Sequence, residues 1–183
     1  GCLRPEDAFC ILGAGVDTNL FAPVPFLEKN KVCTVVMASR LIREKGVFDF
    51  VKAANLLNQA GIPVRMQLIG APDYGNPSSI TKAEFEKIKS DPSVECLDFQ
   101  PDVLPFFRKA HICCLPSFYR EGLPRVLIEA ASSGLALITT DTIGCKEAIR
   151  DNNGFLVQPN DVSSLVKNIS FLVNHPNELK EMG

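Results

Sequence analysis

The sequence predicts an α/β domain with a parallel, doubly wound sheet, because short apolar segments alternate with amphipathic helical patterns along its length. Most of these segments are apolar on both faces, which is typical of parallel strands covered by helices on both sides. The expected architecture is a Rossmann-like three-layer α/β/α sandwich with right-handed crossovers. The expected strands are residues 9–12, 32–38, 64–69, 94–97, 112–115, 136–139 and 154–157.

The expected helices lie between these strands, at residues 46–59, 81–90, 103–110, 124–133 and 161–173. Each presents an apolar stripe with helical spacing. The last helix begins at a capping Asp161 and ends at a His-Pro turn that contains His175. One long irregular loop, residues 71–79, follows the strand at 64–69. Because parallel sheets bind ligands at the carboxyl ends of their strands, such loops are where we expect the chemistry.

Composition and charge exclude several classes of protein. The 183 residues include 19 lysines and arginines against 21 acidic residues, a formal net charge of −2. A general nucleic-acid binder needs an excess of positive charge that this chain lacks. No stretch approaches the roughly 18 uninterrupted apolar residues of a membrane span, and the first residues do not resemble a signal peptide. We therefore expect a cytoplasmic protein with no transmembrane segment and no nucleic-acid partner.

The seven cysteines predict buried thiols in a reducing compartment. Their number is odd, no Cys-x-x-Cys is present, and most lie inside apolar segments. The two histidines, His111 and His175, cannot form a multi-histidine metal site. Neither a disulfide framework nor a metal site is expected.

Two glycine-containing segments bear on nucleotide binding. Gly13 and Gly15 follow an expected strand, but Thr18 stands where a dinucleotide fingerprint needs its third glycine. A pair of turn glycines is the better interpretation. The chain contains no P-loop motif.

Two cations follow the strand at 32–38. Arg40 and Lys45 precede an expected helix, whose N-terminus favours an anion. Arginine presents a planar fork to phosphate oxygens, and lysine presents a mobile point charge. The segment indicates a phosphate site, although by itself it fits a solvated basic turn equally well.

Two carboxylates bracket the N-terminus of the helix expected at 124–133. Glu121 lies in the loop before it, and Glu129 falls on its second turn. Gly122 allows a ligand to approach the backbone, and Pro124 suits the first helical position. A carboxylate beside an anion site can accept hydrogen bonds from sugar hydroxyls. Taken singly, Glu121 could equally be a residue that interacts with the helix dipole. Glu129 could equally be an ordinary charged residue on the surface of the helix.

Taken together, these segments resemble the C-terminal, donor-binding domain of family-4 retaining glycosyltransferases of the GT-B fold. The likeness covers nearly the whole chain. Residues 119–125 resemble the version found in bacterial surface-polysaccharide transferases. The matching positions are Gly15-Val16-Asp17 with Phe21 and Pro23, Ser39-Arg40-Leu41 with Lys45-Gly46, Leu68-Ile69-Gly70, Leu115-Pro116-Ser117, Glu121 with Glu129, Ala130 and Gly134, Gly144-Cys145 with Glu147, and Asn153 to Val157 with Pro159.

The resemblance implies three catalytic residues. Arg40 and Lys45 are expected to hold the donor diphosphate and stabilise the departing nucleotide, and Glu121 is expected to face the transferred sugar. Glu129 is expected to bind the ribose hydroxyls.

Further donor-binding residues follow from the same resemblance. The backbone amides of Gly122 and Leu123 are expected near the sugar and phosphates. The loop 97–101, with Phe99, is expected beside the base, and Gly15 belongs to the same set. No metal or other cofactor is expected, because protein cations and a helix N-terminus replace the metal in GT-B enzymes.

The resemblance further implies a transfer of sugar from a nucleotide diphosphate donor to a glycan or lipid-linked acceptor, with retention of configuration. A UDP-sugar is the first expectation for the donor, followed by GDP-mannose. Residues 1–183 are expected to form one C-terminal domain that lacks the N-terminal acceptor domain and the final crossover helix. Such a domain would bind the donor without transferring sugar, and any peripheral position at the inner membrane face would come through the missing domain. A nucleotide-sugar epimerase and a non-catalytic half-transferase subunit remain as alternatives.

Overall fold

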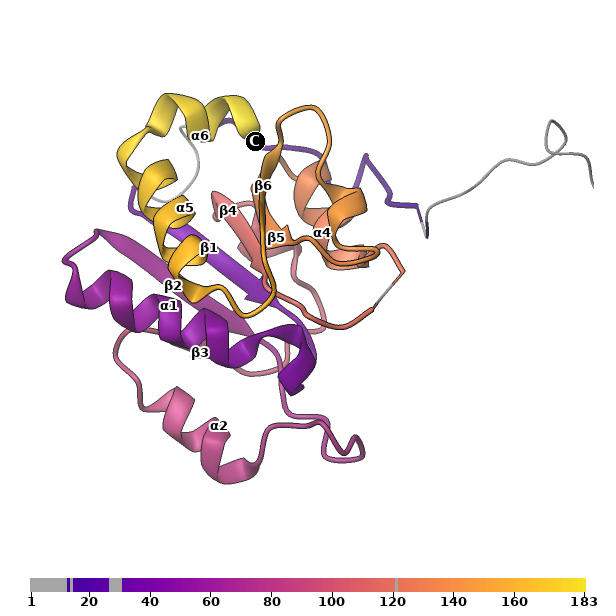
Figure 1. The fold of residues 1–183 in the computed structure, drawn as a ribbon. Helices are drawn as coiled ribbons and strands as arrows, with labels where there is room; N and C mark the ends of the chain where they lie inside the picture. The colour runs from indigo at the N-terminus through magenta and orange to yellow at the C-terminus, as the bar shows by residue number, and fades with distance from the viewer. Residues whose placement is uncertain (1–12, 14, 27–30, 121) are drawn as a thin grey trace, which may run out of the picture.

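A single six-stranded sheet organises the computed structural model, which describes residues 13, 15–26, 31–120 and 122–183. The strand expected at residues 9–12 lies outside the described residues. The sheet order is β3-β2-β1-β4-β5-β6, and every neighbouring pair is parallel (Figure 1). The predicted parallel, doubly wound architecture is confirmed. The strands are β1 (Cys33–Ala38), β2 (Val64–Ile69), β3 (Glu95–Leu97), β4 (Ile112–Leu115), β5 (Ala136–Thr140) and β6 (Gly154–Val157).

Helices connect the strands and cover the two faces of the sheet. In Figure 1, α1 and α5 lie next to each other on one side of the sheet and α4 lies on the other, as right-handed crossovers in opposite directions require. The helices are α1 (Val47–Gln59), α2 (Lys82–Lys89), α3 (Leu104–Phe107), α4 (Arg125–Ser132), α5 (Val162–Asn174) and α6 (Pro176–Met182), with 3₁₀ turns η3 (Arg43–Lys45) and η4 (Lys146–Ala148).

The core lies between these helices and the central strands. All residues of β4 and β5 are buried, as the apolar character of both strand faces predicts. Helix α1 buries Val47, Phe50 and Leu57 at helical spacing against the sheet. The most buried part of the sheet is therefore its centre, formed by β1, β4 and β5.

The helices expected from the sequence lie within one residue of the observed bounds except α3, which ends at Phe107 instead of residue 110. Pro124 precedes α4 in an extended conformation instead of taking its first position. Thr81 caps α2 through a capping box, and Asp161 caps α5 by accepting from the backbone of Ser164. The sequence predicts only a turn at His175, but the structure begins a new helix, α6, with Pro176 at its first position. Burial of Leu179 stabilises this short helix against the rest of the domain.

The order of the strands reverses between β1 and β4. Val35 of β1 pairs with Ile112 of β4, whereas β2 and β3 follow on the other side of β1. The chain continues from β1 and β4 to helices on opposite faces of the sheet, α1 and α4, so a crevice lies at the carboxyl edge (Figure 1). This is where open α/β sheets bind their ligands.

Candidate functional site

The loops after β1 and β4 meet at this crevice through one glycine. Gly46 ends η3 and begins α1 with a left-handed backbone, at a φ of 77°. A Cβ at this position would lie 2.2 Å from the carbonyl oxygen of Pro116, in the loop after β4. Only glycine permits this approach. The contact brings Lys45 next to the segment that carries Ser117 and Tyr119.

Glu44 joins three of the loops at the carboxyl edge. Its backbone carbonyl accepts hydrogen bonds from the amide of Phe118 at 2.9 Å and the hydroxyl of Ser117 at 3.0 Å. Its side-chain Oε1 accepts a hydrogen bond from Ser78, in the loop after β2, and this bond is the main reason the pKa of Glu44 lies below its ordinary value. The Oε2 atom is buried and has no hydrogen-bond partner among the described residues. Glu44 therefore sets the relative positions of the loops after β1, β2 and β4.

The loop between β2 and α2 follows the η3 segment closely. The amide of Leu41 donates to Ala71 at 3.0 Å, and the carbonyl of Leu41 accepts from Ile80 at 3.1 Å. The amide of Arg43 donates to the carbonyl of Ser78 at 2.9 Å. These backbone hydrogen bonds make the irregular loop a defined wall of the crevice.

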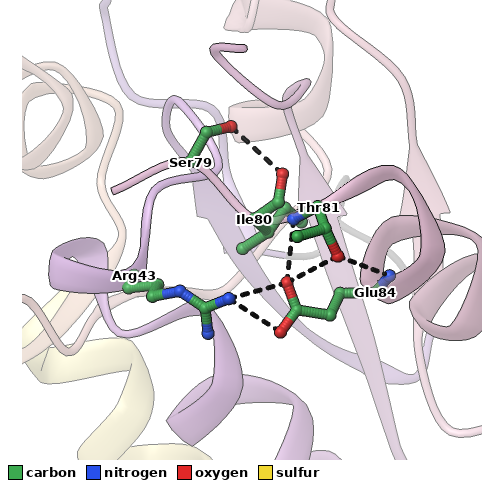
Figure 2. A network of polar contacts seen from close by, with 5 residues as sticks. All are labelled: Arg43, Ser79, Ile80, Thr81 and Glu84. Carbon is green, nitrogen blue, oxygen red and sulfur yellow. Dashed lines mark hydrogen bonds and ion pairs between the residues drawn. The ribbon is translucent and has the colours of Figure 1, made fainter. Parts of the chain in front are cut away.

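A polar network fastens the far end of this loop (Figure 2). The Arg43 guanidinium donates to both carboxylate oxygens of Glu84 at 2.8 Å. The same carboxylate accepts from the amide and hydroxyl of Thr81, at 2.8 and 2.9 Å. Hydrogen bonds from Thr81 and Arg43 lower the pKa of Glu84 to about 2. The network fixes the start of α2 against the loop after β1.

A first cavity of about 480 Å³ opens at the carboxyl ends of β1 and β2. Glu129 of α4 reaches it with a side chain only 14% exposed, and Arg125 contacts the Glu129 carboxylate at 3.2 Å. Phe99 stands at the mouth with 68% of its surface exposed. The lining residues are Ala38, Ser39, Arg40, Ile69, Gly70, Ala71, Pro72, Asp73, Phe99, Gln100, Val103, Val126 and Glu129.

A second cavity of about 440 Å³ lies beside the η3 turn. Its lining is more polar and contains three basic residues, Arg40, Lys45 and Arg120, with one acidic residue, Glu44. A Cβ at Gly122 would meet nothing within 4 Å, so the backbone there is open to a ligand. The lining residues are Arg40, Ile42, Glu44, Lys45, Asn76, Ser78, Tyr119, Arg120 and Gly122.

Arg40 lines both cavities. Its side chain is 64% exposed, and its Nη1 lies 2.9 Å from Oδ2 of Asp73, in the loop after β2. The Arg40 guanidinium therefore lies where the two cavities adjoin, and one of its nitrogens forms an ion pair with the Asp73 carboxylate.

The structure brings most of the expected site residues to these two cavities. Arg40, Phe99 and Glu129 line the first, and Arg40, Lys45 and Gly122 line the second. Two expected residues, Gly15 and Leu123, line neither. Leu123 packs partly buried against the core instead.

Glu121 lies outside the described residues, so its expected position facing the sugar stays a prediction. It belongs to the loop between β4 and α4, one residue before Gly122, which lines the second cavity.

Several lining residues were not anticipated from the sequence. Asp73, Asn76 and Ser78 come from the irregular loop, and Glu44 neighbours an expected cation. The sequence indicates the irregular loop, residues 71–79, as part of a site only through its position after a strand, at the carboxyl edge of the sheet. Nothing in the sequence indicates the contact between Asp73 and Arg40, because Arg40 lies in the loop after β1 and Asp73 lies in the loop after β2.

The two cavities suit a ligand with an apolar or aromatic part, hydroxyl groups and an anionic part. Glu129 can accept hydroxyl hydrogen bonds, Phe99 can stack, and the basic residues around Arg40 can neutralise phosphates. Among the described residues, no three His, Cys, Asp or Glu side chains are grouped to hold a metal ion. None of the described helices has the length and apolar character that crossing a bilayer requires.

The fold and these cavities define an open parallel α/β domain with a cationic site where its strand order reverses. The chain belongs to the Glycosyl transferases group 1 family, whose model matches residues 21–183. This family membership confirms the resemblance to glycosyltransferases found in the sequence.

Curated relatives of the chain are bacterial glycosyltransferases. It is 26% identical over 178 residues to the putative colanic acid biosynthesis glycosyltransferase WcaL of Escherichia coli, covering 93% of this chain and 43% of WcaL. It is 28% identical over 181 residues to the N,N'-diacetylbacillosaminyl-diphospho-undecaprenol alpha-1,3-N-acetylgalactosaminyltransferase of Campylobacter jejuni, covering 92% of this chain and 46% of that enzyme. The chain thus spans less than half the length of either relative.

A solved structure with the same fold is Alr3699/HepE of Anabaena, determined in complex with UDP. The TM-score is 0.77 at 22% sequence identity, over 92% of this chain and 48% of that one. The same protein is also known in complex with UDP-glucose, with a TM-score of 0.76. The likeness establishes the GT-B type of fold for this domain.

Proposed function

We propose that this chain is the nucleotide-sugar-binding half of a retaining glycosyltransferase. The observation that carries the proposal is the pair of adjoining cavities that share Arg40 at the carboxyl edge. One has the hydroxyl acceptor and aromatic group that a nucleoside needs, and the other has the cations that a sugar diphosphate needs.

The donor occupies both cavities in this proposal. The nucleoside lies in the first, where Glu129 accepts the ribose hydroxyls and Phe99 lies beside the base. The diphosphate lies between Arg40 and Lys45, and the sugar continues past Gly122 in the second. Glu121 keeps the role that the resemblance implies, contact with the transferred sugar.

A UDP-sugar is the donor that we propose first. The complexes of Alr3699/HepE with UDP and with UDP-glucose support this choice, because that protein shares the fold. The acceptor is a glycan or a lipid-linked sugar, which the words 'colanic acid biosynthesis' and 'diphospho-undecaprenol' in the names of the relatives support.

The transfer proceeds with retention in this proposal. An acceptor oxygen attacks the anomeric carbon on the face from which the diphosphate leaves, and the bond to the diphosphate oxygen breaks. The departing nucleotide carries away the bonding electron pair and takes up the acceptor proton. Arg40 and Lys45 stabilise the charge that develops on it, so the reaction needs no metal from the protein.

Calorimetric titration with UDP, GDP and ADP, each with and without EDTA, tests the proposal. We expect UDP to bind independently of the chelator, and Glu129→Ala to weaken it about 10- to 100-fold, since hydrogen bonds to a carboxylate are lost. Glu178→Ala on α6 is the matched control, because α6 packs at the amino end of β5, away from the cavities. Absence of binding by all three nucleotides would refute the proposal.

A transfer assay separates the remaining alternatives. We expect this chain alone, supplied with UDP-glucose and glycan acceptors, to form no glycoside. Isomerisation of the donor sugar without an acceptor would favour the epimerase, and transfer restored by a separate acceptor-domain protein would favour the half-transferase subunit.

A further inference from the structure

We propose that Asp73 sets the affinity of the site for its donor by competing with the diphosphate for Arg40. The inference rests on the proposed function, because it concerns the same anion site. It makes Asp73, which lines the first cavity, an affinity-determining residue that acts through its charge.

The geometry places a carboxylate where a phosphate oxygen is to bind. Oδ2 of Asp73 lies 2.9 Å from Nη1 of Arg40. This is the one hydrogen bond of the Arg40 side chain to any described residue. Carboxylate and phosphate oxygens use the same planar guanidinium fork, so they compete for its donors.

Asp73 remains near Arg40 when a ligand arrives, because its backbone is held on both sides. Pro72 forms a parallel bridge with Leu41, and the Asp73 carbonyl accepts from the amide of Asn76 at 2.8 Å. Further along, Ser78 is bound to Glu44. The loop therefore cannot carry the Asp73 carboxylate away from the site without losing these contacts.

The ion pair is weak enough for a diphosphate to displace. The Arg40 side chain is 64% exposed and that of Asp73 is 34% exposed, and exposed pairs of this kind contribute little. After displacement, the Asp73 charge still lies within a few ångströms of the bound diphosphate and repels it. Both effects lower the affinity for a diphosphate, and both act on its negative charge, which a nucleoside without phosphate lacks.

The variant Asp73→Asn distinguishes the effect of the Asp73 charge from the effect of the size of its side chain. Asparagine keeps the size of the side chain and can still accept from Arg40, but it carries no charge. We expect this variant to bind UDP about three- to tenfold more tightly than the unmodified chain at low salt, with the gain shrinking as salt is added. Affinity for uridine should not change. Asp151→Asn is the matched control, an exposed aspartate that precedes β6 at the opposite edge of the sheet.

A double-mutant cycle with Arg40→Ala tests the competition itself. In the Arg40→Ala chain, Asp73→Asn should give a clearly smaller gain in affinity for UDP than in the unmodified chain, since the contested group is gone and only the direct repulsion remains. A full gain in that chain would mean that Asp73 acts on the diphosphate alone, and would overturn the competition. Unchanged or weaker UDP binding by the Asp73→Asn chain would overturn the inference while leaving the proposed function intact. Failure of every chain to bind UDP would overturn both.

Discussion

The backbone of Gly46 lies against the carbonyl group of Pro116, with 2.2 Å between the position of a Cβ and the carbonyl oxygen. The two residues belong to loops that leave β1 and β4, the strands between which the sheet order reverses. The contact leaves no room for any side chain at residue 46. Together with the hydrogen bonds of Ser117 and Phe118 to the Glu44 carbonyl, it joins the loop that carries Lys45 to the loop that leads to Gly122.

Gly46→Ala should destabilise the domain strongly. Gly46 and Gly61 both have a left-handed φ, 77° and 67°, but only Gly46 has backbone in the way of a Cβ. We expect Gly61→Ala to lower the free energy of unfolding by about 1 kcal/mol, and Gly46→Ala by at least about 3 kcal/mol. Urea denaturation measures both. Equal losses for the two variants would show that the Pro116 contact relaxes without cost.

Glu84→Gln should reduce stability at neutral pH and change its dependence on acid. The pKa of Glu84 lies at about 2 in the folded domain, below its ordinary value. The carboxylate therefore stabilises the fold fully at a pH above the ordinary pKa of glutamate, and this contribution is lost as the pH falls towards 2. Melting temperatures of the two chains should differ at pH 7 and converge between pH 4 and about 2. Glu86→Gln, at an exposed position on the same helix, is the control.

Asp49→Asn should stabilise the domain at neutral pH. Oδ2 of Asp49 is buried without a hydrogen-bond partner in the described part of the chain, and burial raises the pKa of this carboxyl. Folding therefore favours the protonated form, and stability falls as the pH rises through the raised value. We expect the variant to melt about 1–3 °C higher at pH 7 and no higher at pH 3. A lower melting temperature at pH 7 would mean that attraction to the N-terminus of α1 outweighs the burial.

The thiols of Cys113 and Cys114 should not react in the folded domain. Both are fully buried in β4, and burial raises the pKa of Cys113 to about 12 and that of Cys114 still further. The thiolate is the reactive form, so neither access nor ionisation favours modification. At pH 8, a maleimide should label these two cysteines only at the rate of unfolding, as peptide mapping can measure. Rapid labelling of either in the native chain would contradict the buried packing of β4.

The fold was predictable because its signals are local. Segments that are apolar on both faces predict strands covered by helices. Apolar residues at helical spacing, such as Val47, Phe50 and Leu57, predict which face of a helix is buried. The helix that the sequence does not predict, α6, is short and polar, and burial of Leu179 against the core stabilises it. Such a tertiary contact leaves little trace in periodicity.

The candidate site was predictable in part. Arg40, Lys45 and Glu129 could be recognised because their motifs adjoin strand ends and helix starts. Asp73 could not, because its role depends on a contact between loops that are far apart in the sequence. The hydrogen bonds of Glu44 with Ser78 and Ser117 could not be predicted for the same reason. They form only because the order of strands in the sheet brings these three loops together.

The position of β1 beside β4 also bears on how the protein is made. A nascent chain can pair β1, β2 and β3 while translation continues, but Pro116 and Ser117, which contact Gly46 and Glu44, follow β4, which is synthesised later. Until β4 docks, β1 presents the unpaired backbone of a mostly apolar strand to its surroundings. A chain stalled before β4 would therefore combine an unformed crevice with a strand edge prone to aggregation.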